Sequence, residues 1–419
     1  MKESGFKDVT RVSAARERLL DAVTPVTETV SLRLPEADGR VLAEDARAAR
    51  DVPHYPRAAM DGYAVRAEDT FGASGRSPAV LRERERDEPG GPEAAVPVHT
   101  GSELPDGADA VVMIEETERV PGTGTERATG DAGSRFAGEV EVFDAVAEGE
   151  NVAPPGEDVE ADQLLYEAGH RLRPSDLGLL KSTGVARVDC YERPTVGVIP
   201  TGEELVQSNP APGETIETNG LTVSALVERW GGRAEYRDVV TDDAAALRAA
   251  VQRDLTKDIV VTTGGSSVGE RDLIPEVVDD LGELLVHGVA LKPGHPCALG
   301  VVEETPVLML PGYPVACIVN AVQFLRPALK AAGRMPNESL PTTEARLTRK
   351  IASAPGERTF ARVKLDAEGD ETVATPTRAS GSGVLSSVAL ADGWVVVRED
   401  SEGLAEEETV AVQNWEYHA

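Results

Sequence analysis

The chain has 419 residues, 41% of them hydrophobic, which is enough for several domains with substantial apolar cores. Acidic residues outnumber basic residues by 73 to 42, giving a formal net charge of −31 at pH 7. Such a surface repels nucleic acid and anionic lipid, so we expect neither a nucleic-acid nor a membrane partner. The three cysteines stand far apart, outside any Cys-x-x-Cys pair, and the N-terminus lacks the apolar run of a signal peptide. We therefore expect reduced thiols and a cytoplasmic protein.

The first part of the chain predicts a small mixed unit interrupted by a β-rich insertion. The stretch VSAARERLLDAV has apolar residues at helical spacing. From residue 53 to 147 the sequence alternates in short apolar pieces between glycine-rich turns, which is typical of strands. We assign residues 1–52 and 148–192 to a discontinuous N-terminal unit of α/β character, and residues 53–147 to a β-rich arm domain.

The second part of the chain changes pattern after Arg193. The β-branched runs PTVGVIPTG, AEYRDVVT, DIVVTTGG and TPVLMLPG alternate with helical stretches, which predicts a parallel sheet with right-handed crossovers over residues 193–334. Residues 335–419 contain short strands and no helical pattern, and predict an all-β, barrel-like domain. The fold class is therefore multidomain α/β plus β, with a central parallel α/β sheet domain, an arm, a mixed unit and a C-terminal β domain.

Three of the predicted parallel strands end in a glycine turn, in IPTGEEL, TTGGSSVGERD and LMLPGYPVA. A single such turn most often has a structural role. Three turns at one sheet edge favour a ligand site, because the carboxyl ends of parallel strands meet in one crevice. Backbone N–H groups in these turns and at the helix start near Val315 would receive phosphate or another oxyanion. The candidate residues are Thr201, Gly202, Gly264, Gly265, Ser266, Ser267, Pro311 and Gly312.

A lysine in the motif ALKPGHP supplies a candidate cation for the same anion. Lys292 is followed by Pro293 and Gly294 in a chain where lysine is scarce, and this favours a functional role over a surface role. Pro293 and Gly294 complete the turn. His295 follows, and it either hydrogen-bonds the anion or is a solvent-exposed turn residue.

Seven motifs together resemble the molybdopterin molybdotransferase family, which includes bacterial MoeA and the E domain of gephyrin. They are PRAAMDGYAV, HTGSELPDGADAVVMIEETE, GENVAPPGEDV, PTGEEL, TTGGSSVGERD, LKPGHP and LPGYPV, in the family's order. The resemblance implies an enzyme that inserts molybdate or tungstate into adenylylated molybdopterin and releases AMP with the help of Mg²⁺ or another divalent cation. It also implies an elongated homodimer of four-domain subunits and, as a further partner, the molybdopterin adenylyltransferase.

The resemblance also assigns roles to individual residues. Asp61, Glu204, Asp272 and Lys292 match catalytic positions, and Asp61 would reach the site from the partner subunit. The divalent cation would be held by Glu204, Asp272 and Asp158, in agreement with the preference of Mg²⁺ for carboxylate oxygens. An acid in a Gly-Glu-Asp turn is as often a turn-forming residue, so both interpretations of Asp158 stay open. Ligand-side positions are matched by Thr100, Ser267, Arg358 and Ser382.

Three residues depart from the family pattern. His295 stands where a second lysine is usual, Tyr313 where asparagine is usual, and Ala316 where serine is common. A hydroxyl and a permanent cation are thereby missing from the region expected to hold the oxyanion, which leaves the choice between molybdate and tungstate open. Two other functions also stay open: a molybdopterin adenylyltransferase, which shares the sheet domain, and a non-catalytic molybdopterin-binding scaffold.

The net charge leads to a prediction about salt, since it fits a salt-rich cytoplasm and suggests a halophilic archaeal source. Self-repulsion at a charge of −31 should destabilise the folded state in dilute buffer. Added salt screens it, because the Debye length falls from about 30 Å at 0.01 M to about 3 Å at 1 M. The thermal midpoint should therefore climb with KCl, and a flat or falling midpoint up to molar KCl would contradict this expectation.

Overall fold

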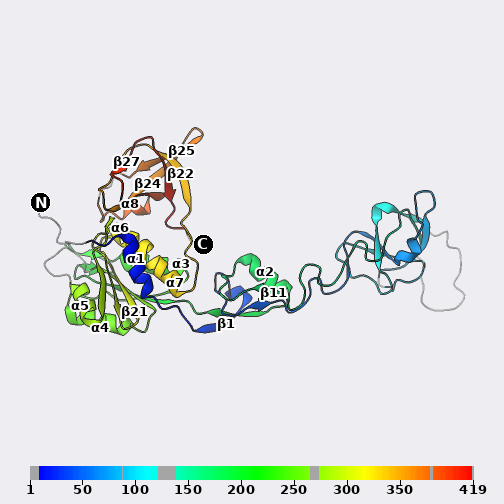
Figure 1. Ribbon diagram of the computed structural model, residues 1–419, viewed down its shortest axis with the longest axis horizontal. Helices are drawn as coiled ribbons and strands as arrows, with labels where there is room; N and C mark the ends of the chain where they lie inside the picture. Colours follow the sequence, from blue (N-terminus) through cyan, green and yellow to red (C-terminus); the bar gives the residue numbers. More distant parts are fainter. Residues whose placement is uncertain (1–8, 87, 121–137, 265–272, 378–380, 418–419) are drawn as a thin grey trace.

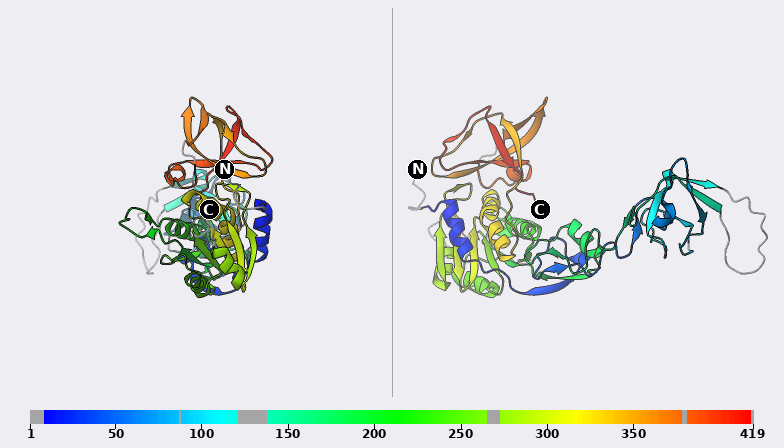
Figure 2. Two further views of the ribbon diagram at one scale, coloured as in Figure 1. Left: turned by 90° about the vertical axis from the view of Figure 1, so that its left-hand side faces the viewer. Right: turned by 45° about the vertical axis from the view of Figure 1, so that its right-hand side comes forward.

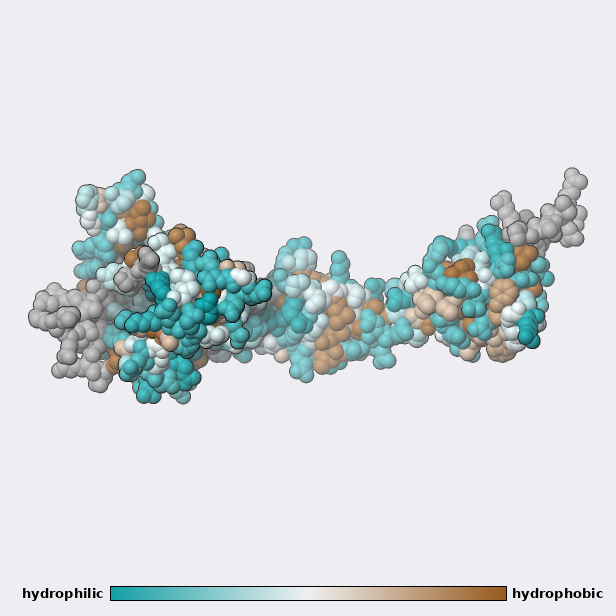
Figure 3. All heavy atoms as spheres, turned by 90° about the horizontal axis from the view of Figure 1, so that it is seen from above, coloured by the Kyte–Doolittle hydropathy of each residue, from teal (hydrophilic) through white to brown (hydrophobic). Residues whose placement is uncertain are grey.

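The computed structural model describes residues 9–86, 88–120, 138–264, 273–377 and 381–417. The molecule is elongated (Figure 1): the sheet domain and the C-terminal domain lie together at one end, the small mixed unit lies in the middle, and the β-rich arm lies at the far end. Hydrophilic side chains cover most of the face seen in Figure 3, as the charge of the sequence predicts.

The sheet domain contains a six-stranded sheet with the order β16-β13-β17-β21-β20-β18. The four predicted strands are confirmed and parallel, but β20 and β18 join as antiparallel strands that we did not predict. A tight turn at Glu303, whose φ is 56°, connects β20 to β21 without the glycine that usually marks a hairpin. The strands are β13 (Thr195–Pro200), β16 (Arg233–Tyr236), β17 (Ile259–Thr263), β18 (Glu283–His287), β20 (Ala298–Val302) and β21 (Thr305–Leu310).

Helices cover both faces of this sheet because its strands are apolar on both sides. Val198 and Val261 face the cluster that contains α3, the long helix and α1, whereas Ile199 and Val260 face the cluster with α4 and α5. We predicted that residues 1–52 belong to the N-terminal unit, but α1 buries Leu19 in the core of the sheet domain. The other domain boundaries stay predictions. The helices are α1 (Val12–Asp21), α3 (Asn219–Arg229), α4 (Ala244–Asp254) and α5 (Leu273–Leu281).

The long helix runs from Pro314 to Ala332 in three consecutive segments. These are α6 (Pro314–Asn320), a π-helical turn η4 (Ala321–Leu325) and α7 (Arg326–Ala332). The π turn precedes Pro327, which has no N–H for the regular helical bond. Within the described residues this is the helix whose length and mean hydropathy of 1.2 would suffice for a membrane span. It is 89% buried inside the protein, as a core helix is.

The C-terminal domain is a closed barrel standing on the sheet domain (Figure 2). Its sheet has the order β19-β24-β25-β22-β28-β26, and β26 also pairs with β24, which closes the ring. The expected β domain is confirmed, with the addition of the short helix α8 (Ser386–Ala389). The other elements are β19 (Leu291–Lys292), β22 (Thr342–Leu347), β23 (Ile351–Ala352), β24 (Arg358–Glu368), β25 (Glu371–Pro376), β26 (Gly393–Val397), β27 (Gly403–Leu404) and β28 (Thr409–Gln413).

The small mixed unit is built from two segments of the chain that pair with each other. Strand β1 (Thr29–Arg33) pairs antiparallel with β12 (Arg187–Tyr191), and helix α2 (Pro174–Ser182) covers the pair. The chain leaves this unit for the arm and returns to it. Its remaining elements are η1 (Leu34–Glu36), β2 (Ala46–Arg47) and β11 (Leu164–Tyr166), whereas the short pair β3 (Arg57–Ala58) and β10 (Val152–Ala153) packs against strands of the arm.

The arm is β-rich, as predicted, with a separate six-stranded sheet in the order β7-β4-β6-β5-β9-β8. Tyr63, Leu81 and Val140 are buried in its core, which includes no residue of the sheet domain. The arm is therefore a separate folding unit at the end of the molecule. Its elements are β4 (Gly62–Val65), η2 (Ala67–Thr70), β5 (Ala79–Glu83), β6 (Ala94–Val98), β7 (Ala110–Met113), η3 (Ile114–Glu116), β8 (Thr117–Val120) and β9 (Gly138–Val142).

Candidate functional site

A cavity of about 540 Å³ opens at the carboxyl ends of β13, β17 and β21, and we name it the strand-end cavity. Strand β13 is followed in the chain by β16 on one side of it and by β17 on the other. The cavity therefore lies at the switch point of the sheet, where ligands bind in open α/β folds. The two-stranded ribbon of β14 (Leu205–Val206) and β15 (Thr215–Ile216) forms its outer wall.

The polar groups that line this cavity include the hydroxyls of several threonines. Thr201 and Thr263 are buried, and neither hydroxyl has a hydrogen-bond partner in the described structure. The expected backbone donors are already used: the N–H of Thr201 donates to Thr263 O at 3.1 Å, that of Gly202 to Val240 O at 3.1 Å, and that of Gly264 to Leu310 O at 3.0 Å. Our interpretation of these turns as backbone anion receptors is therefore wrong for Thr201, Gly202 and Gly264.

The N-terminus of helix α6 likewise has no free backbone N–H at the two positions expected to receive an anion. Pro314 has no N–H, and the N–H of Val315 donates to Ser382 O at 3.0 Å, so the expected anion contact near Val315 is replaced by a bond to the C-terminal domain. Gly264 instead has a steric role. Its φ is 119°, and a Cβ there would lie 2.1 Å from Thr201 O, so only glycine allows β13 and β17 to end this close together.

The acidic side of the strand-end cavity is formed by Glu204, which lines it, and by Asp242 nearby. Partial burial, followed by the charges of Glu204 and Glu203, raises the pKa of Asp242. A neighbouring cation would relieve this repulsion. Asp242 was missed in the sequence because it lies just before α4, 38 residues from Glu204. Among the described residues no group of three potential ligands forms a ready metal centre.

A second cavity of about 680 Å³ lies between the sheet domain and the barrel, and we name it the interdomain cavity. Pro296, Pro311 and Tyr313 belong to the walls of both cavities, so the two adjoin. Tyr313 is 62% exposed at this junction. The structure brings together in the interdomain cavity the predicted residues Lys292, Pro293, Gly294, His295, Pro311 and Ser382, and also Ala316.

Lys292 is positioned by a pairing between two domains. Strand β19 runs parallel to β24 of the barrel, with Lys292 opposite Thr359. The side chain is exposed at the cavity rim and forms no ion pair with the described residues. Next to it, Asn320 Nδ2 donates to Gly294 O at 3.0 Å and to Ala316 O at 2.8 Å, which ties the lysine loop to the long helix.

Two arginines of β24 occupy different cavities. Arg362 lines the interdomain cavity, and burial lowers its pKa. Arg358, which we expected in the anion site, lines a separate cavity and forms an ion pair with Glu399 at 2.8 Å. Sequence reasoning missed Arg362 because the stretch PGERTFARVK contains both arginines and does not show which of them faces which cavity.

The remaining predicted residues lie elsewhere. Asp61 is in the arm, where its Oδ1 accepts from the N–H of Thr100 at 2.7 Å and from its hydroxyl at 3.1 Å, and these bonds lower the pKa of Asp61. Asp158 is exposed near Val52, between the arm and the mixed unit. Within one chain the arm, which carries Asp61, lies at the opposite end of the molecule from the sheet domain, which carries Glu204 (Figure 1). Gly265, Ser266, Ser267 and Asp272 lie outside the described residues.

Comparison with known proteins identifies the family. Residues 10–184 match the model of the MoeA N-terminal region (domain I and II), residues 197–331 a probable molybdopterin binding domain, and residues 344–415 the MoeA C-terminal region (domain IV). A Methanocaldococcus jannaschii protein named for molybdopterin biosynthesis is 36% identical over 407 residues, which cover 94% of each chain. The chain belongs to the MoeA family.

Other MoeA relatives extend this comparison. The molybdopterin molybdenumtransferase of Haemophilus influenzae is 30% identical, with 95% of this chain and 97% of that protein covered. Two crystal structures of the MoeA molybdopterin biosynthesis protein of Pyrococcus horikoshii superpose with TM-scores of 0.80 and 0.77 at 33% and 31% identity. They cover 98% and 97% of this chain and all of theirs. The family predicted from the motifs is thus confirmed over nearly the full length.

The interdomain cavity leads to a prediction about Lys292. A lysine that contacts an anion in a partly enclosed site contributes about 1.5–3 kcal/mol. Lys292→Ala should therefore weaken the binding of molybdate, measured by calorimetric titration, at least about tenfold. Lys364→Ala is the matched control, because Lys364 is exposed on β24 and lines neither cavity. An affinity that is equal in Lys292→Ala and the wild type would remove Lys292 from the anion site.

Proposed function

We propose that this chain is a molybdopterin molybdenumtransferase, which inserts molybdate or tungstate into adenylylated molybdopterin and releases AMP. Relatives with this name match it over nearly their full length. The observation that carries the proposal is the pair of adjoining cavities: a hydroxyl-lined one at the sheet switch point and a cationic one under the barrel. Because the two cavities share a wall at Tyr313, a nucleotide-type ligand in one would lie beside an oxyanion in the other, which supports metal insertion.

The roles of the residues follow from this division. The hydroxyls of Thr201 and Thr263 donate to polar groups of the pterin substrate, because they have no other partner in the described structure. Lys292 and Arg362 hold the oxyanion by charge. The nearby barrel encloses the oxyanion and limits its exposure to water, which strengthens both contacts. His295, which lines the same cavity, stands where the family usually has a lysine.

A divalent cation, with Mg²⁺ as our choice, fits the carboxylate side of the strand-end cavity. Glu204 and Asp242 would hold it together with Asp272, and their mutual repulsion would fall on binding. When bound, the cation neutralises charge on the phosphate of the leaving AMP. The second interpretation of Asp158, as a turn residue, is favoured by its exposed place away from Glu204 within one chain.

The two alternative functions make different predictions for one reaction. Purified protein is incubated with adenylylated molybdopterin, Mg²⁺ and molybdate, and AMP is followed by chromatography. The proposed transferase should release AMP only when molybdate or tungstate is present. An adenylyltransferase would instead form the adenylylated substrate from molybdopterin and ATP, and a scaffold would bind without turnover. Absence of oxyanion-dependent AMP release would contradict the proposal.

We also propose that the active site is shared between the subunits of a homodimer. Asp61 is exposed, its carboxylate is held by Thr100, and the arm carries it far from the sheet domain of its own chain. A second copy of the chain could bring that sheet domain opposite the arm. The arrangement would complete the site with Asp61 from one subunit, and with Glu204, Asp272 and Lys292 from the other.

The shared site can be tested by mixing two inactive mutants. Asp61→Ala and Glu204→Ala should each abolish most activity alone, because either loss disrupts the site. After they are unfolded and refolded together, about half of the dimers should be mixed, each with one intact site and one doubly mutated site. About a quarter of wild-type AMP release should therefore return. If an affinity tag on one mutant shows mixed dimers without recovered activity, both acids belong to one chain's site.

The cellular context remains part of the proposal. We place the enzyme in the cytoplasm of a salt-rich cell, because the chain carries a net charge of −31 and its cysteines at 190, 297 and 317 are buried and free. The molybdopterin adenylyltransferase is the expected partner, because it would supply the adenylylated substrate.

A further inference from the structure

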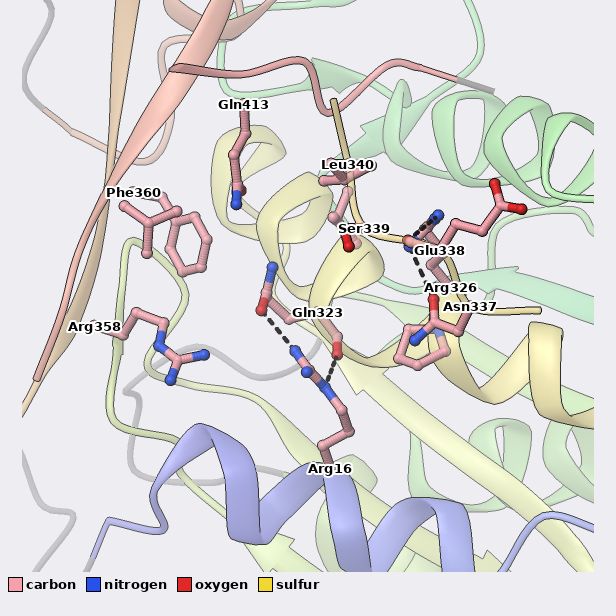
Figure 4. A pocket seen from close by; sticks show the side chains of 13 residues that line it. Arg16, Gln323, Arg326, Asn337, Glu338, Ser339, Leu340, Arg358, Phe360 and Gln413 are labelled. Carbon is pink, nitrogen blue, oxygen red and sulfur yellow. Dashed lines mark hydrogen bonds between the residues drawn. The ribbon is translucent and has the colours of Figure 1, made fainter. Parts of the chain in front are cut away.

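A third cavity, of about 310 Å³, lies on the other side of the barrel contact (Figure 4). We name it the arginine cavity after Arg16, Arg326 and Arg358 in its lining. These residues come from α1, the long helix and β24, so the cavity sits where three parts of the chain meet. Neither the molybdenum transfer site nor the shared dimer site uses it.

Two of the arginines are fixed in place by hydrogen bonds. Arg16 donates through Nε to Gln323 O at 3.0 Å and through a terminal nitrogen to Gln323 Oε1 at 2.8 Å. Arg326 donates to Asn337 Oδ1 at 2.8 Å and to Glu338 O at 2.9 Å, while its buried Nε has no partner in the described structure. The cations are therefore preorganised, and one donor is left unsatisfied.

The amide side chains present donors to the cavity because their oxygens are already occupied. The Oε1 of Gln323 accepts from Arg16, and the Oε1 of Gln413 accepts from Trp394 Nε1 at 3.0 Å. Figure 4 shows the amide nitrogens of Gln323 and Gln413 directed into the space between the helix and the barrel. In the described part of the chain neither nitrogen has a partner, so both can donate to a ligand.

The acids near the cavity do not balance its positive charge. Glu399 pairs with Arg358, but the carboxylate of Glu338 points away from the space between Arg16 and Arg358 in Figure 4. Burial, followed by the positive charges of Arg358 and Arg326, lowers the pKa of Arg16, and burial also lowers that of Arg326. The chain as a whole has a net charge of −31, but three arginines are held together here. A bound anion would reduce the repulsion between their positive charges.

We propose that the arginine cavity binds a phosphate group, either inorganic phosphate or the phosphate of a small organic molecule. Planar guanidinium groups and amide N–H donors match the oxygens of a tetrahedral dianion. The volume is at the lower end for small-molecule sites, about 300–1,000 Å³, and leaves room for a phosphate with a small substituent. A bound phosphate would connect α1, the long helix and the barrel.

The site is distinct from the interdomain cavity although both use β24. Arg358 lines only the arginine cavity and Thr359 only the interdomain cavity, while Phe360 belongs to the walls of both. Arg358 pairs with Leu291 in the ladder that positions Lys292. Phosphate in the arginine cavity would thus steady the barrel against the strand that carries Lys292.

Calorimetric titration of the Lys292→Ala protein tests the proposal, because this background weakens anion binding in the interdomain cavity. Inorganic phosphate and glycerol 3-phosphate are the two ligands, each at ionic strength held constant with KCl. At least one of them should bind one site per chain. Adding Arg16→Met or Arg358→Met should raise the dissociation constant at least about tenfold, as expected for a lost charge-assisted contact.

Arg398→Met is the matched control, since the side chain of Arg398 is 80% exposed on the same barrel. It should leave the dissociation constant unchanged, and circular dichroism should show that all variants are folded. Tighter binding of glycerol 3-phosphate would identify an esterified phosphate as ligand, and tighter binding of phosphate the free ion. No binding of either, or equal binding with Arg16→Met and Arg358→Met, overturns the proposal.

Discussion

The apolar contact between the barrel and the sheet domain is the interaction on which the candidate site depends. Phe360 and Trp394 of the barrel pack at 5.2 Å between ring centroids and belong to the same buried cluster as Phe324 of the long helix and Val198 of the sheet. The two domains therefore have one continuous core. Aromatic burial of this size dominates the energy of such contacts, so it holds both walls of the interdomain cavity in place.

The positions of the polar side chains at the interdomain cavity depend on that apolar contact. Because the barrel is fixed, its strand β24 can pair with β19 and set Lys292 at the rim of the cavity, with Arg362 in the lining. The carbonyl oxygen of Ser382 accepts a hydrogen bond from the N–H of Val315, and this bond joins the barrel to the start of the long helix. The interdomain cavity thus depends on the interface, whereas the strand-end cavity lies chiefly on the sheet domain.

The arm differs from the barrel, because its core contains only its own side chains and shares none with the sheet domain. An independent unit at the end of the molecule can present Asp61 to another chain without disturbing the sheet domain. Apolar contacts within one chain form the cavities. In the proposed dimer, a contact between two chains would add Asp61 to the residues of the site. In the single chain Asp61 is exposed, and its carboxylate is oriented by the N–H and the hydroxyl of Thr100.

Local patterns in the sequence determined the family, the four parallel strands, the barrel-like tail and the turn that carries Lys292, because side-chain periodicity and turn chemistry are short-range properties. Only the tertiary structure decided how these groups are used. Gly264 donates its N–H to Leu310 O and allows close packing at its turn, and Arg362 rather than Arg358 lines the interdomain cavity. The acceptor of a backbone N–H and the cavity that a side chain lines both depend on strands that are distant in the sequence, so short-range patterns do not determine them.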